Sequence, residues 1–109
     1  LEVNVGKEES KSGIYLEGLN ELVSEVAEMD NIKIKGLMTI PPICDSEAEV
    51  SKYFESMYQT FIDIKNKKID NVDMDILSMG MSHDYEAAVK NGSNIVRVGS
   101  AIFGARKYF

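Results

Sequence analysis

Residues 74–98 read MDILSMGMSHDYEAAVKNGSNIVRV, and this stretch decides the fold class. An apolar run over residues 74–77 predicts a strand, and a helical pattern follows over residues 82–90. Asn91 and Gly92 end that helix, and a second apolar run begins at residue 95. Two strands joined through a helix form a parallel βαβ unit.

Two further strands are expected on the amino-terminal side of this unit. The first covers residues 3–5 and the second covers residues 34–40. Gly36 interrupts the second strand, and Pro41 and Pro42 end it because proline has no N–H to donate to a sheet. The last strand is expected to cover residues 95–98, so the chain contains four strand patterns.

Helices are expected between these strands. Apolar side chains at spacings of three and four over residues 14–29 predict a helix with one buried face. That face is expected to consist of Tyr15, Leu19, Leu22, Val26 and Met29. The next helix begins after Asp45 or Ser46, and its buried face is expected to consist of Val50, Tyr53 or Phe54, Met57, Phe61 and Ile64. A last helix is expected to begin near Ala101.

Four parallel strands with helices between them fit two architectures: a small open doubly wound sheet, or half of a (β/α)8 barrel. The chain begins with Leu1 directly before a strand and stops at Phe109 soon after a glycine-rich turn. These ends favour a truncated chain over a complete small protein, and they favour the half barrel. Half a barrel leaves apolar strand faces and two open sheet edges, so such a chain is expected to self-associate.

Composition excludes several classes of protein. The 109 residues suit one domain, and the net charge of −6 argues against a nucleic-acid partner. Cys44 and His83 are the only residues of their types, so neither an intrachain disulfide nor a Cys/His zinc site is expected. The chain shows no signal peptide and no apolar run near the roughly 20 residues that span a bilayer, which predicts a cytoplasmic protein without a membrane partner.

Ligands of parallel α/β folds bind at the carboxyl ends of the strands. The loops after the last two strands are expected at residues 78–82 (SMGMS) and 99–104 (GSAIFG). Ser82 stands at an expected helix start, and Gly99 and Ser100 follow the last strand, so together they offer hydroxyls and amides to one anion. Tight turns explain the same small residues, and the spacing leaves both interpretations open.

Five other side chains have two interpretations each. Arg97 points either into the mouth of a barrel or outward to a helix carboxylate. Lys7 and Lys11 follow the first strand and are either amines that form a reversible imine with an aldehyde or ion-paired loop lysines. His83 is expected to be a surface or capping residue rather than a base. Cys44 has no basic neighbour in sequence and is expected to be an unreactive thiol.

Two longer strings carry a family resemblance. ILSMGMSHDYEAA at residues 76–88 and VRVGSAIFGAR at residues 96–106 resemble signatures of the YggS/PROSC family of pyridoxal phosphate homeostasis proteins. Shorter matches at residues 3–5, 9–14 and 35–40 extend the resemblance almost from end to end. The resemblance implies a fold related to the alanine racemase N-terminal domain, a (β/α)8 barrel that binds pyridoxal 5′-phosphate (PLP). Residues 1–109 resemble only its carboxyl-terminal half, strands five to eight.

The resemblance also implies roles for individual residues. The implied cofactor-binding residues are Ser78, Met81, Ser82, Arg97, Gly99 and Ser100. Arg97 matches the arginine that faces the pyridine nitrogen of PLP, whereas the others form or line the phosphate cup. The Schiff-base lysine of the family lies on an early strand, in the half that this chain lacks, and Lys11 is the candidate for a secondary PLP lysine.

The expected function is therefore that of a non-catalytic PLP carrier or buffer, with PLP-dependent apo-enzymes as partners. An arginine at the ring nitrogen disfavours a second positive charge there and weakens the electron sink that PLP chemistry uses. This half also shows no evident catalytic base at a strand end. Two alternatives remain open: a racemase-like PLP enzyme, and a small phosphate-binding or partner-binding module.

Overall fold

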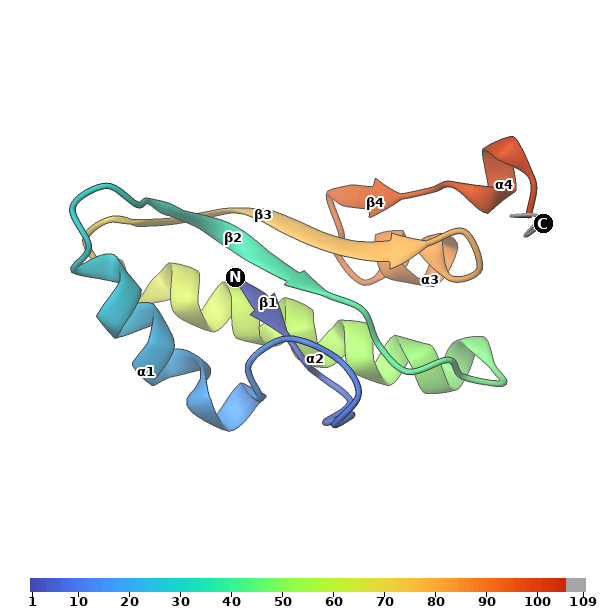
Figure 1. Cartoon of the computed structure of the whole chain (residues 1–109), viewed down its shortest axis with the longest axis horizontal. Helices are drawn as coiled ribbons and strands as arrows, with labels where there is room; N and C mark the ends of the chain where they lie inside the picture. The colour runs from blue at the N-terminus through green and yellow to red at the C-terminus, as the bar shows by residue number, and fades with distance from the viewer. Residues whose placement is uncertain (106–109) are drawn as a thin grey trace.

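The computed structural model describes residues 1–105, in which strands and helices alternate as expected (Figure 1). The elements are β1 (Glu2–Val3), α1 (Leu16–Ala27), β2 (Ile34–Thr39), α2 (Glu47–Asn66), β3 (Val72–Met81), α3 (Tyr85–Lys90), β4 (Ile95–Arg97) and α4 (Ser100–Phe103). The first and last strands end earlier than predicted, at Val3 and Arg97. Arg106 of the second signature string and the last three residues lie outside the described part of the chain.

The four strands form one parallel sheet in the order β1-β2-β3-β4. Right-handed crossovers between strands in sequential order bring all the helices to one face of a sheet. Figure 1 shows α1 and α2 on the same side of the sheet. A doubly wound sheet reverses its strand order at a switch point, so the observed order contradicts that interpretation and fits part of a (β/α)8 barrel.

The buried face of α2 holds the helix against the sheet. Phe54, rather than Tyr53, completes this face and is fully buried. Its buried residues are Val50, Phe54, Met57, Phe61 and Ile64. Ser46, rather than Asp45, caps the helix, because its hydroxyl accepts a hydrogen bond from the N–H of Glu49 at 3.2 Å.

The predicted face of the first helix is wrong at both ends. Tyr15 is the N-cap of α1 and Met29 follows its C-cap, so both lie outside the helix and are exposed. The residues that α1 buries are Leu19 and Val23, so Val23 takes the place of the predicted Leu22, which is half-buried. Apolar spacing indicated a helix here, but it did not show where the helix begins and ends.

The third strand continues past its predicted end at Leu77 to Met81. Gly80 explains the difference, because it is buried in the strand with φ +105° and a Cβ there would lie 2.7 Å from the Cβ of Ala88. The missing side chain lets α3 pack against β3, so this glycine serves a strand rather than a loop. The next helix begins at Tyr85, and Ser82 therefore lies in a turn instead of at a helix start.

The outer edge of β1 is partly covered, whereas the sequence predicted an open edge. The N–H of Asn4 donates to the carbonyl of Ile14 at 2.8 Å, and the N–H of Ile14 donates to the carbonyl of Glu2 at 3.0 Å. Gly13 permits this close return with φ +108°, where a Cβ would lie 2.9 Å from the nitrogen of Asn4. Within residues 1–105, β4 is the edge strand without a partner on its outer side.

Candidate functional site

The turn after β3 and the turn after β4 meet at one hydroxyl group. The Oγ of Ser82 accepts hydrogen bonds from the N–H of Gly99 at 3.1 Å and from the N–H of Ala101 at 3.0 Å. Because the oxygen is the acceptor in both bonds, the hydroxyl hydrogen is left to donate to a further acceptor. The structure thus brings Ser82, Gly99 and Ser100 together as a group of small residues that suits the oxygens of a phosphate.

Asp84 holds the turn that carries Ser82. Its Oδ1 accepts the N–H of Met81 at 2.7 Å, and its own N–H donates to the carbonyl of Met81 at 3.2 Å. The carboxylate is buried, so these bonds are shielded from water. Asp84 is not among the residues predicted from the sequence, although an aspartate directly before a short helix is a signal for such a turn.

Ser78 is the one implied site residue that the structure places apart from this group. It lies inside β3, in register with Met38 of β2 and Ile95 of β4. Four residues of strand separate it from Ser82, which corresponds to about 13 Å. Met81, at the end of β3, lies in register with Arg97 and is close to the turn.

Arg97 reaches across the sheet from the end of β4. Its Nη2 donates to the carbonyl of Thr39 at 2.9 Å, and Thr39 is on β2, so the side chain passes β3. The ion pairs found in the described residues do not include Arg97, so the outward pairing with a helix carboxylate is not what the structure shows. Its Nε is buried and has no hydrogen-bond partner within residues 1–105.

A buried N–H group without an acceptor is costly, since it has lost its water and gained no partner. The Nε–H of Arg97 is therefore a buried donor at the carboxyl ends of the strands that has no acceptor within residues 1–105. A positively charged group there favours an electron-rich acceptor.

Lys7 and Lys11 are both engaged in ion pairs. The Nζ of Lys11 lies 2.8 Å from Glu8 and donates to the carbonyl of Pro41 at 3.0 Å, so it joins the loop after β1 to the loop after β2. Lys7 lies 2.7 Å from Glu17, at the start of α1. Lys11 is thus the lysine held at the carboxyl ends of the strands, whereas Lys7 faces a helix.

Asn4 is a second residue that the sequence analysis missed. Its amide is buried and donates to the carbonyls of Glu8 at 2.7 Å and Lys11 at 3.3 Å, while its Oδ1 accepts the N–H of Glu8 at 3.0 Å. These bonds give the loop after β1 its shape and place Lys11. An asparagine between two valines in an expected strand was the available signal.

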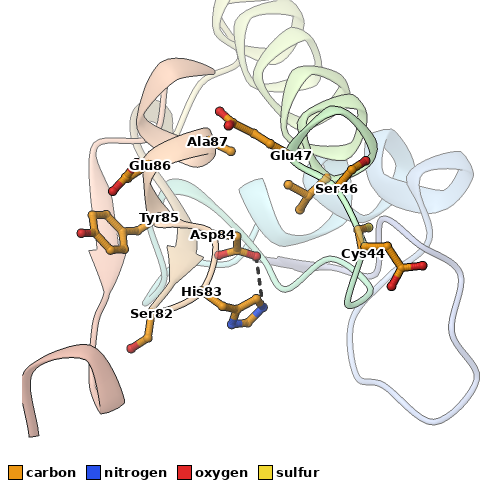
Figure 2. Close-up of a pocket in the computed structure, with 11 residues that line it drawn as sticks. Cys44, Ser46, Glu47, Ser82, His83, Asp84, Tyr85, Glu86 and Ala87 are labelled. Atoms are coloured by element: carbon orange, nitrogen blue, oxygen red, sulfur yellow. Dashed lines mark ion pairs between the residues drawn. The ribbon is translucent and has the colours of Figure 1, made fainter. Parts of the chain in front are cut away.

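A pocket of about 350 Å³ lies beside the turn, between the amino ends of α2 and α3 (Figure 2). His83 and Ser82 point in different directions from the same turn, and His83 lies 3.5 Å from Asp84. The imidazole is exposed, as expected for a surface residue. Glu47 and Glu86 also line the pocket, so its charge does not suit a phosphate.

The described residues contain no cluster of three metal-ligating side chains and no helix of the length and hydropathy needed to cross a membrane.

Cys44 is expected to react slowly with alkylating agents. Burial raises the pKa of its thiol, and the carboxylates of Glu49 and Asp45 raise it further, so less thiolate is present at neutral pH. Iodoacetamide should modify the folded chain more slowly than the chain unfolded in guanidinium, and the difference should narrow as pH rises through the raised pKa. Cys44 is the single cysteine, so the unfolded chain serves as the control. A rate ratio that does not change with pH would contradict the prediction.

Comparison with known proteins identifies the class to which this fold and site belong. The family described as "Alanine racemase, N-terminal domain" matches residues 1–107. The chain belongs to this family.

Two relatives of the chain carry the same name. The chain is 44% identical over 108 residues to the pyridoxal phosphate homeostasis protein of Aquifex aeolicus, covering 99% of this chain and 46% of that protein. It is also 44% identical over 108 residues to the protein of that name from Escherichia coli K12, covering 99% and 45%. The resemblance to the YggS/PROSC family is thereby confirmed, and the chain spans less than half the length of these relatives.

Solved structures agree on the fold. A protein from Bifidobacterium adolescentis titled as unknown superposes with a TM-score of 0.88 at 38% identity, covering 94% of this chain and 41% of that one. PipY of Synechococcus elongatus without PLP gives 0.86 at 28% identity, covering 95% and 48%. The PipY structure titled as having PLP bound gives 0.78 at 25% identity, covering 94% and 49%.

Proposed function

We propose that residues 1–109 form the carboxyl-terminal half of a PLP-binding (β/α)8 barrel, with β1 to β4 corresponding to strands five to eight. The sequential parallel sheet and the relatives of about twice the length support this proposal. The amino-terminal half, which carries the Schiff-base lysine in the family, then lies outside this chain.

The observation that best supports this function is that the Ser82 hydroxyl joins the loop after β3 to the loop after β4. Ser82, Gly99 and Ser100 form the site for the phosphate of PLP. The N–H of Gly99 holds the Ser82 oxygen in place, and the hydroxyls of Ser82 and Ser100 are the donors to the phosphate. Met81 lines the same site at the end of β3, whereas Ser78 lies earlier in the strand, about 13 Å from Ser82, and would contact a part of the cofactor other than its phosphate.

The unpartnered Nε of Arg97 fits the remaining part of the cofactor. The pyridine nitrogen of PLP is an acceptor, and a guanidinium donates a hydrogen bond to it without giving up its proton. When bound, PLP supplies an electron sink for reactions at an amino-acid carbon. Arg97 opposes protonation of the ring nitrogen by like-charge repulsion, so the cofactor is held while its sink is weakened.

These properties suit a PLP carrier or buffer that serves PLP homeostasis and hands the cofactor to PLP-dependent apo-enzymes, without catalysis of its own. The names of the curated relatives support the homeostatic role. His83, the single histidine, is exposed and paired with Asp84 instead of standing at the ring of a ligand. Racemisation of alanine by the purified protein would contradict the non-catalytic part of the proposal.

Titration of this chain with PLP, followed by fluorescence or calorimetry, tests the proposed site. We expect saturable binding that inorganic phosphate competes away. Ser82→Ala should weaken binding about tenfold, as loss of one hydrogen bond to a charged group does. Ser24→Ala is the matched control, because Ser24 lies on the exposed surface of α1. Absence of PLP binding, or binding unaffected by phosphate and by Ser82→Ala, would overturn the proposed site.

Lys11 is proposed as a secondary PLP lysine. Its amine lies at the carboxyl ends of β1 and β2, within the same face of the barrel as the phosphate turns. Borohydride reduction of the PLP-treated chain and peptide mass mapping should find the adduct at Lys11 rather than at Lys7. An adduct spread over the surface lysines would contradict this assignment.

The chain is also expected to self-associate through its open β4 edge. Ile95, Ile102 and Phe103 are exposed there, by 43%, 67% and 85%. Exposed apolar side chains beside an unpaired strand favour pairing with a second copy. Sedimentation velocity should show dimers or larger species, and Ile102→Ser with Phe103→Ser should shift them to monomers. Ile43→Ser, on the exposed loop between β2 and α2, is the control. Monomers at all concentrations would refute the prediction.

A further inference from the structure

Thr39 links the ends of three strands. It is fully buried at the end of β2, and its Oγ1 donates to the carbonyl of Val3 on β1 at 2.6 Å. The carbonyl of Thr39 accepts the Nη2 of Arg97 from β4 at 2.9 Å. The Arg97 guanidinium is therefore anchored on a residue whose own position depends on a side-chain hydrogen bond to β1.

A side chain at the last residue of β2 makes the contact with Val3. Ile40 separates Thr39 from Pro41 and Pro42, and the two prolines have no N–H with which to extend the backbone ladder towards β1. The hydroxyl of Thr39 supplies a donor to the Val3 carbonyl where the strand ends. A valine would keep the shape of this side chain and lose the donor.

The guanidinium group transmits this anchoring to its Nε–H, which has no partner within residues 1–105. Its N–H groups lie in one rigid plane, so a bond from Nη2 to a fixed carbonyl restricts the direction of the Nε–H of the same group. In the described residues the Nη2 of Arg97 has that bond and its Nε has none.

We propose that Thr39 is a positioning residue that, through the Val3 and Arg97 contacts, orients the Arg97 Nε–H towards the ring nitrogen of a pyridine phosphate. The inference rests on the proposed function, and it adds a residue that the loop motifs do not contain. Thr39 itself touches no ligand, so its effect depends on whether the ligand has a ring nitrogen.

Two phosphate esters separate ring recognition from phosphate recognition. Pyridoxine 5′-phosphate has the ring nitrogen and no aldehyde, whereas benzyl phosphate has neither. Thr39→Val should weaken binding of pyridoxine 5′-phosphate about tenfold and that of benzyl phosphate less than about twofold, because one hydrogen bond to a charged donor is misplaced. Thr39→Ser keeps the hydroxyl and should restore the affinity of the unmodified chain.

Equal weakening of both esters would overturn the proposal, because it would show general damage to the site. No weakening of either would overturn it as well. If the unmodified chain binds neither ester, the proposed function fails, and the positioning role is then decided without ligand by NMR. The Nε–H signal of Arg97, assigned by its absence in Arg97→Lys, should exchange with solvent at least about tenfold faster in Thr39→Val. Unchanged exchange would refute the role of Thr39.

Discussion

Gly36→Ala is expected to destabilise the chain strongly. Gly36 lies in β2 beside β3. A Cβ there would lie 1.9 Å from the carbonyl oxygen of Ile76, which is closer than two non-bonded atoms can approach. The obstacle is backbone of the neighbouring strand, so no side-chain rotation relieves it. The free energy of unfolding should fall by more than about 3 kcal/mol, the upper end of common overpacking costs, out of the roughly 5–15 kcal/mol of an ordinary domain.

Thermal and urea denaturation followed by circular dichroism measure this loss. Gly18→Ala is the matched control, since Gly18 lies in α1 and a Cβ there meets only the flexible end of Ile14 at 3.1 Å. Alanine favours a helix over glycine by about 1 kcal/mol, so the control should be neutral or more stable. Equal stability of the two variants would show that β2 and β3 are not packed as closely as described.

Arg97→Met should weaken binding of pyridoxine 5′-phosphate by about 10- to 100-fold, which corresponds to the roughly 1.5–3 kcal/mol of a hydrogen bond to a charged group. Stability should change by less than about 1 kcal/mol, because the lost bond to Thr39 is offset by removal of a buried, unpartnered N–H. Calorimetric titration and thermal denaturation of the same samples measure both quantities.

Arg97→Lys is the companion variant, since it keeps the charge and loses the planar donor pair. Its affinity should lie between those of Arg97→Met and the unmodified chain. If Arg97→Met instead lowered stability strongly and left affinity unchanged, Arg97 would be a structural residue that ties β4 to β2.

The sequence predicted elements well where the pattern was long and uniform. The α2 face is confirmed from Val50 to Ile64, because a helix of this length repeats its buried positions several times. Prediction failed where one glycine decided the outcome. The sequence pattern predicts a loop at Gly80. In the structure its missing side chain makes room for Ala88, a residue that becomes its neighbour only after α3 has packed.

The candidate site also contains residues that the sequence indicated and residues that it did not. The two small-residue loops were visible in the sequence as runs of glycine and serine, and the parallel topology predicted that they would meet. Asn4 and Thr39 were not identified, because their importance depends on which carbonyls lie within reach of their side chains. Those carbonyls belong to other segments, up to 36 positions away for Thr39 and Val3.

By itself the sequence determined the alternation of strands and helices, the family and the loops that carry the candidate phosphate site, since local patterns and motifs specify these. Only the tertiary structure decided the sequential strand order, the placement of Ser78 apart from Ser82, and the anchoring of Arg97 on Thr39 with Nε left unpartnered. These features depend on contacts between residues distant along the chain. Such contacts are set by how the strands pack, which no local pattern records.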